Sequence, residues 1–143
     1  MITFTSKKQA TDYAKQMRRE GWKAAVSPVS PRAWQVKLHF PDEGQSRRET
    51  LGELIEGQRN VGYKVRFVGD DELHDYAGAN PEFGRASGWP CPPKTFLVDK
   101  HFSVKGKVKV LGHEIVEEEL MKRGWNYHDA HLEALAIERQ LAR

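Results

Sequence analysis

A histidine and a glutamate near the C-terminus have the residue types and the spacing of metal ligands. His113 and Glu117 stand four residues apart, so on a helix their side chains project from the same face, one turn apart. Val116 and Leu120 share that face and are the residues that the helix should bury. An imidazole and a carboxylate that are buried next to apolar side chains lose their hydrogen bonds to water, so each needs a polar or charged partner in the protein. A metal ion is such a partner, and the arrangement is that of the zinc-binding H-E-x-x-H pair with Glu117 in place of the second histidine.

A second helix should bring a third ligand to the same place. Asn126 has the character of an N-cap, and Asp129 three residues later can complete a capping-box-like start. One stripe of this helix then carries His131, Ala134, Leu135, Glu138 and Leu141. Because the link at 123–126 is short, we expect the two helices to form a hairpin in which His131 faces the first helix.

These residues together predict a metal site with hydrolytic chemistry. His113, Glu117 and His131 would hold zinc or another divalent metal and leave one position for water. Glu114 would act as the general base, its role in the H-E-x-x-H arrangement. Glu138 would support a histidine or serve as an alternative ligand. The substrate would be a peptide or a phosphodiester, and the sequence does not choose between them.

The same residues also admit a purely structural interpretation. His113 would then be an N-terminal helix residue, beside a solvated acidic face made of Glu114 and the glutamates at 117–119. His131 and Glu138 would form a buried polar pair with no metal. His74 and His101 show no matching partner in the sequence, and Cys91 is interpreted as structural.

The C-terminal pattern resembles a group of bacterial and phage-associated proteins. The segment runs from Val98-Asp99 through His113, Glu114 and Glu117 to Tyr127, Ala130-His131 and Glu138. It is similar to proteins with an H-E-x-x-E and then a Y-x-x-A-H pattern, a variant of the zincin helix motif. The resemblance covers about the last 45 residues. It implies a shared site and no particular reaction.

Composition favours one folded domain, or a domain with an appendage. The chain has 143 residues, 38% of them hydrophobic, which suffices for a core. Its single cysteine excludes an internal disulfide and fits a reducing compartment. No apolar run approaches the ~18 residues of a membrane span, and the first residues lack the order of a signal peptide. We therefore expect a cytoplasmic protein.

Charge is distributed unevenly along the chain. Residues 1–40 carry eight basic and two acidic side chains, whereas residues 113–143 carry seven acidic and four basic ones. This asymmetry suggests a basic surface at one end and an acidic site at the other. Contacts with nucleic acid or an acidic protein would use Lys7, Lys8, Arg18, Arg19, Lys64 and Arg66. The alternative function is thus a non-catalytic nucleic-acid- or protein-binding module of a phage or mobile element, and a solvated sheet face explains the same residues.

The predicted elements indicate an α+β fold, with a small antiparallel or mixed sheet, packed helices and a C-terminal helical hairpin. Residues 1–77 form a basic α/β layer: strands at 2–4, 23–29, 33–40 and 63–68, and helices at 7–20, 47–59 and 70–76. A hairpin at 30–32 and a polar connector at 42–46 join these elements. Residues 78–94 form a Gly/Pro-rich loop, a lid or partner contact. Residues 95–143 contain a strand at 95–99, a β-hairpin around 105–107 and the helical hairpin. All three segments should form one compact domain.

The first segment resembles half of a SPOR-like repeat. The resemblance lies in a strand, a helix carrying Tyr13-Ala14-Lys15 and Met17-Arg18, then Gly21-Trp22-Lys23-Ala24, and a strand with Trp34 and Val36. It covers about 40 residues and implies the βαββ topology also found in ferredoxin-like units. SPOR domains bind peptidoglycan outside the cytoplasm. Only the topology is carried over, because no export signal is visible.

Overall fold

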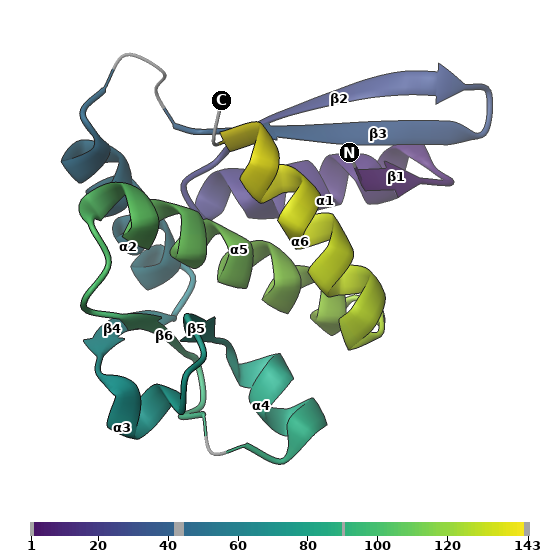
Figure 1. Ribbon diagram of the computed structural model, residues 1–143. Coiled ribbons are helices and arrows are strands. Elements are labelled where there is room, and N and C mark those ends of the chain that lie inside the picture. The colour runs from purple at the N-terminus through teal and green to yellow at the C-terminus, as the bar shows by residue number, and fades with distance from the viewer. Residues whose placement is uncertain (1, 42–44, 90, 142–143) are drawn as a thin grey trace. The chain divides into compact units, whose positions relative to one another are not determined.

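The computed structural model describes residues 2–41, 45–89 and 91–141, and the chain divides into two compact units, Met1–Val61 and Gly62–Arg143 (Figure 1). The boundary between the units falls well before residue 78, where we expected the basic α/β layer to end. The segment 63–76, predicted as part of the N-terminal layer, belongs to the second unit. Positions 42–44 of the predicted connector and position 90 of the predicted loop lie outside the described residues, as does the side chain of Leu141.

The described residues of the first unit form a three-stranded antiparallel sheet and two helices. Its elements are β1 (Ile2–Phe4), α1 (Lys7–Arg19), β2 (Lys23–Ser30), β3 (Ala33–His39) and α2 (Arg47–Asn60). The strand order is β1-β3-β2, and β2 and β3 form the predicted hairpin. Ser6 caps α1, because its hydroxyl accepts a hydrogen bond from the Gln9 N–H at 3.1 Å. The apolar face of α1, including Tyr13 and Met17, is buried. The predicted strand–helix–strand–strand order is confirmed.

The second unit combines a mixed sheet with four helices among its described residues. Its elements are β4 (Lys64–Val68), α3 (Asp70–Leu73), β5 (Gly78–Ala79), α4 (Pro81–Ser87), β6 (Thr95–Asp99), α5 (Val104–Lys122) and α6 (Tyr127–Leu141). The sheet order is β4-β6-β5, in which β6 pairs parallel with β4 and antiparallel with β5. Helix α5 packs against β5 and β6 and carries α6 as its helical partner (Figure 1). The α+β class and the C-terminal helical pair are as predicted.

The predicted β-hairpin around residues 105–107 is wrong, because these residues form the first turns of α5. The Ser103 hydroxyl caps the helix by accepting a hydrogen bond from the Gly106 N–H at 3.1 Å. Val108, Leu111 and Ile115 are buried at helical spacings of three and four. His113 consequently lies in the middle of a 19-residue helix and not at its N-terminus.

The Gly/Pro-rich segment is more regular than a loop. It contains the edge strand β5 and the short helix α4, whose first residue is Pro81 and whose N-cap is Asn80. A proline at the first helical position loses nothing, since its missing N–H would be unbonded there. Gly88, at φ 74°, ends the helix in the left-handed conformation. The described part of this segment contains no long helix and no central strand, as predicted.

A tight connection sets the pairing of α5 with α6. Gly124 has a φ of 97°, its N–H donates to Met121 O at 3.0 Å, and the Trp125 N–H donates to Leu120 O at 3.1 Å. These two bonds form a Schellman motif that ends α5 and reverses the chain. Asn126 then opens α6, its side-chain oxygen accepting from the Asp129 N–H at 2.9 Å, which confirms the predicted cap.

None of the described helices combines the length and the apolar character needed to cross a membrane.

Candidate metal centre between the two C-terminal helices

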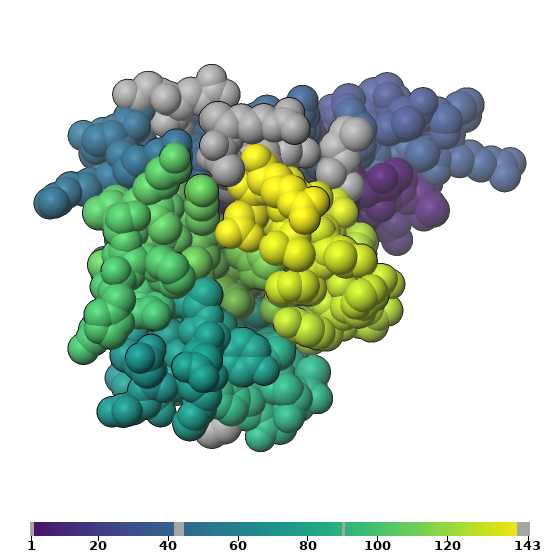
Figure 2. Space-filling model, viewed as in Figure 1, coloured from purple at the N-terminus to yellow at the C-terminus, as the bar shows by residue number. Residues whose placement is uncertain are grey.

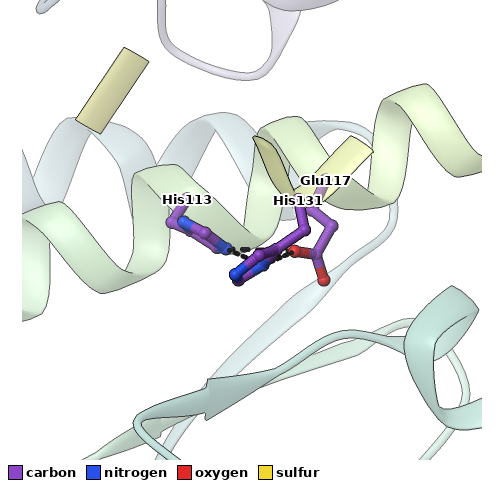
Figure 3. A group of neighbouring side chains, drawn as sticks. All are labelled: His113, Glu117 and His131. Atoms are coloured by element: carbon purple, nitrogen blue, oxygen red, sulfur yellow. Dashed lines mark hydrogen bonds and ion pairs between the residues drawn. The ribbon is translucent and has the colours of Figure 1, made fainter. Parts of the chain in front are cut away.

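Three side chains from α5 and α6 direct one atom each to a common point. The Nε2 of His113 lies 3.0 Å from the Oε2 of Glu117 and 3.2 Å from the Nδ1 of His131, and that Nδ1 lies 2.9 Å from the same Glu117 oxygen (Figure 3). We call these three residues the helix cluster. Their ligand atoms converge as the i, i+4 spacing on α5 and the helical hairpin led us to expect.

The three short contacts cannot all be hydrogen bonds. If the Nδ1–H of His131 donates to Glu117, that nitrogen has no lone pair for His113, and the two nitrogens face each other at 3.2 Å without a bond. If the nitrogen instead accepts from His113, its lone pair faces the Glu117 oxygen at 2.9 Å. One contact therefore stays repulsive in either proton arrangement. A cation at the common point would attract all three atoms.

The spacing also fits a small divalent cation. A tetrahedral zinc with bonds of about 2.0–2.1 Å holds its ligand atoms about 3.3 Å apart. The triangle formed by the helix cluster has sides of 2.9, 3.0 and 3.2 Å. It would need to open by only a few tenths of an ångström. Two imidazole nitrogens and one carboxylate oxygen form a donor set that suits zinc and related metals.

Glu138 on α6 orients His113. Its Oε2 lies 3.2 Å from the Nδ1 of His113, so a proton on this nitrogen is donated to Glu138, and loss of the Nε2 proton would free a lone pair for a cation at the common point. A carboxylate behind a histidine is the usual support for a metal-bound imidazole. The purely structural interpretation paired Glu138 with His131, whereas the contact found joins Glu138 to His113 on the other helix.

The glutamates of α5 do not form a solvated face. Glu114, Glu117, Glu118 and Glu119 are at most 7% exposed, so this structural interpretation of the sequence is wrong. Glu118 accepts a hydrogen bond from the backbone N–H of Glu82 at 2.8 Å, at the start of α4. Glu119 forms an ion pair with Arg123 at 3.1 Å. Burying a carboxylate without partners is unfavourable, and each of these has one.

Asn80, which the sequence reasoning missed, connects two of these carboxylates. Its side-chain nitrogen donates to Glu114 Oε2 and to Glu117 Oε1, both at 3.0 Å, and its oxygen accepts from the Phe83 N–H at 2.8 Å. The residue is fully buried. The pair Asn80-Pro81 has the residue types of a helix start, an N-cap followed by proline at the first helical position. This local signal predicts the short helix that begins at Pro81. Nothing local in the sequence indicates that the amide also reaches α5.

Burial and neighbouring charge shift the protonation of these groups. Burial, together with the charge of Glu117, raises the pKa of Glu114 to about 8. Burial also pushes the pKa of Glu117 upward, but hydrogen bonds from His113 and His131 outweigh it and lower that pKa. For His113, burial lowers the pKa, while the hydrogen bond to Glu117 and the surrounding carboxylates raise it further, with a net upward shift. The site thus attracts positive charge.

A cavity of about 220 Å³ opens beside the helix cluster. It is lined by Tyr76, Ala77, Gly78, Phe83, Val110, His113, Glu114, Glu117, Tyr127, His131, Leu135 and Glu138. Figure 2 shows the surface hollowed where the teal segment before α4 meets the green α5 and the yellow α6. Gly78 allows β5 to approach α5, because a Cβ there would lie 2.7 Å from Val110 Cγ1 and 3.2 Å from Glu114 Cγ. Glu114, the predicted general base, faces this cavity.

A row of aromatic rings leads from the surface to the helix cluster. Tyr76, which is half exposed, meets Phe83 at a centroid distance of 5.5 Å, and Phe83 meets Tyr127 at 5.1 Å. Tyr127 stacks on His131 at 5.4 Å. Burial raises the pKa of Tyr127 to about 12, so its hydroxyl keeps its proton at neutral pH. These contacts hold the His131 ring in place from its outer side.

A second group of possible ligands lies where β4 and β6 end. It consists of Asp70, Asp99 and His101, and we call it the strand-end cluster. Asp99 Oδ1 accepts a hydrogen bond from the backbone N–H of His101 at 2.9 Å. The same oxygen lies 2.9 Å from the Nδ1 of the His101 ring. The sequence showed no partner for His101, and the structure provides one. Asp70 and His101 are exposed.

The basic residues that we assigned to a nucleic-acid surface belong to two different units. Lys7, Lys8, Arg18 and Arg19 lie on α1 of the first unit, whereas Lys64 and Arg66 lie on β4 of the second. Several already have partners: Lys7 sits over the Trp34 ring, Arg18 donates to Ala24 O at 2.7 Å, and Arg66 lies 3.7 Å from Glu72.

Cys91 is half-buried and packs against Gly84 of α4, where an added Cβ would lie 2.7 Å from the Cys91 Cβ. Burial raises the pKa of its thiol to about 11, which suits a packing role and not a nucleophile.

Comparison of the chain with protein-family models, with curated proteins and with solved structures found no match.

Proposed function

We propose that this protein is a hydrolase that uses zinc or another divalent metal held by His113, Glu117 and His131. The observation that carries the proposal is the convergence of their three ligand atoms within 3.2 Å of one another, in contacts that protons alone do not satisfy. Three protein ligands beside an open cavity are the arrangement of catalytic zinc sites, in which the fourth position is left for water. A metal bound there would supply Lewis acidity and make water a better nucleophile at neutral pH.

Glu114 is the general base of the proposal. It lines the cavity and is fixed by the same Asn80 amide that holds Glu117, so its carboxylate stays beside the metal ligands. In the reaction the water oxygen forms a bond to the electrophilic atom of the substrate, and the bond to the leaving group breaks. Glu114 accepts the water proton and delivers it to the leaving group, so one water adds across the cleaved bond.

The test combines metal analysis with one conservative variant. Protein purified without a histidine tag should contain about one divalent metal per chain by elemental mass spectrometry. Incubation with mixtures of peptides and of phosphodiesters, followed by mass spectrometry, should reveal cleavage in one of them. Glu114→Gln keeps the size and the hydrogen bond to Asn80, so it should retain the metal and lose cleavage.

Two results would contradict the proposal. The first is a protein that binds no divalent metal even when zinc is added in excess. The second is a Glu114→Gln variant that cleaves as fast as the unmodified protein, since the base would then lie elsewhere.

A further inference from the structure

The cavity beside the helix cluster is lined by two kinds of groups. The polar groups are the metal-ligand candidates with Glu114 and Glu138. The apolar groups are the side chains of Val110 from α5 and Leu135 from α6 and the rings of Phe83 and Tyr76. A substrate bound here would place its reacting bond at the helix cluster and a carbon-rich group against the apolar side chains.

No lysine or arginine is among the described residues that line this cavity. Sites that bind phosphoryl groups usually supply arginine, lysine or a helix N-terminus to their oxygens. Here the ionisable groups besides the two histidines and the two tyrosines are the carboxylates of Glu114, Glu117 and Glu138. A divalent cation would be largely neutralised by these carboxylates. Little positive charge would remain to attract a phosphate.

The aromatic part of the lining offers a surface of a definite kind. The rings of Tyr76, Phe83 and Tyr127 contact one another in sequence, with centroid distances of 5.5 and 5.1 Å. Tyr76 and Phe83 meet edge to face, and Phe83 and Tyr127 are tilted by 44°, so the rings present both faces and edges to a bound group. Burying a phenyl-sized group against such a wall gains roughly tenfold or more in affinity.

We propose that the cavity accepts an uncharged acyl compound, an amide or ester whose carbonyl lies at the helix cluster and whose apolar side group lies against Val110, Leu135 and Phe83. This inference rests on the proposed function and selects carbonyl substrates over the phosphodiesters that the sequence left open. The apolar group supplies most of the affinity, and the carbonyl supplies the reacting bond.

The experiment is an NMR titration of the ¹⁵N-labelled protein with three small probes. N-benzylacetamide has the ring and the amide, N-methylacetamide lacks the ring, and phenyl phosphate has the ring with an anionic group. In zinc-loaded protein, N-benzylacetamide should shift the signals of Val110, Leu135 and Tyr127. It should bind at least about tenfold more tightly than either other probe.

A pair of lysine variants makes the test site-specific. Leu135→Lys puts a cation on the cavity wall, so it should weaken N-benzylacetamide about tenfold and strengthen phenyl phosphate. Leu132→Lys is the matched control, because Leu132 lies on the same helix but is 52% exposed and does not line the cavity. It should change neither affinity.

The outcomes separate this inference from the proposed function. Phenyl phosphate binding as tightly as N-benzylacetamide, or equal binding of the two amides, would overturn the inference even if zinc binds. If zinc does not bind, the proposed function fails, and the amides are compared on the metal-free protein. A tenfold advantage of the benzyl probe there would still support an apolar cavity, and its absence would reject it.

Discussion

The helix cluster and the strand-end cluster hold the same kinds of groups, histidine and carboxylate, at similar distances within one unit. Their surroundings differ. Glu117 in the helix cluster is 2% exposed, and its partners come from two packed helices. Asp70 and His101 of the strand-end cluster are exposed, and His101 is bound to Asp99 through a local turn. Similar distances therefore do not imply similar affinity. What differs is the preorganisation of the ligands and the loss of competing water.

Supporting contacts show the same contrast. In the helix cluster Glu138 fixes one histidine, Tyr127 stacks on the other and Asn80 fixes the carboxylate. In the strand-end cluster the contacts of Asp99 are with His101, two residues away. A site whose ligands must first be ordered binds a metal more weakly, because the cost of ordering them offsets part of the binding free energy. We therefore expect one metal site in this unit, at the helix cluster.

Removal of a histidine from either cluster should give the largest difference. His113→Ala or His131→Ala deletes one of three ligands and should weaken zinc binding by more than about 100-fold. His101→Ala, the matched change in the strand-end cluster, should leave the affinity unchanged. Isothermal titration calorimetry of zinc into the metal-free proteins measures all three. If His101→Ala and His131→Ala weakened zinc binding equally, the helix cluster would not be the zinc site that this comparison requires.

Removal of Asn80 should destabilise the metal-free fold. Asn80→Ala takes a donor from two buried carboxylates and a cap from α4, so unfolding should become easier by about 2–3 kcal/mol. Asn126→Ala removes an exposed cap of α6 and should lose only about 1 kcal/mol. Urea unfolding followed by circular dichroism gives both values. Similar losses in the two variants would mean that the Asn80 bridge contributes little beyond its cap.

The support given by Glu138 should have an intermediate effect on zinc. Glu138→Ala frees the His113 ring, and we expect a loss of about tenfold in affinity. Glu138→Gln keeps an acceptor oxygen for the Nδ1–H and should lose less. Competition with a zinc chelator resolves the two variants. Equal losses in the two variants would contradict this role, because an acceptor oxygen for the His113 Nδ1–H would then make no difference.

The strand-end cluster should show only a small effect, in proton binding. The backbone N–H of His101 is the main cause that lowers the pKa of Asp99, and the imidazole adds to it. A lowered pKa means that this carboxylate contributes stability above its unfolded pKa, which is lost as the pH falls through the folded value. His101→Ala keeps the N–H, so the pKa should rise only partway to its ordinary value. Carbon-detected NMR between pH 2 and about 6 measures the pKa of Asp99 in both proteins. A complete return of this pKa to its ordinary value in His101→Ala would contradict the assignment of the backbone N–H as the main cause.

The sequence predicted the elements whose signals are local. Ser6 before α1, the short link before Asn126 and the alternation in β3 each set a local conformation by capping, chain reversal or pleating. The convergence of His113, Glu117 and His131 also followed, since an i, i+4 pair and a helical hairpin leave few geometries. These features need no knowledge of distant residues.

What the sequence missed depends on tertiary context. The start of α5 was misread because Val104 and Val108–Val110 favour a strand locally, and burial against β6 decides for helix. Asn80 reaches Glu114 and Glu117 across more than 30 positions, and no local pattern encodes such a contact. The burial of the glutamates depends on these partners, so an acidic run alone looked like a solvated face.

Anomalous X-ray diffraction at the zinc absorption edge, on crystals grown with zinc, tests the central claim most directly. The account predicts one strong peak per chain, about 2.0–2.2 Å from His113 Nε2, Glu117 Oε2 and His131 Nδ1. A peak at Asp99 and His101 instead, or no peak at the helix cluster, would contradict it.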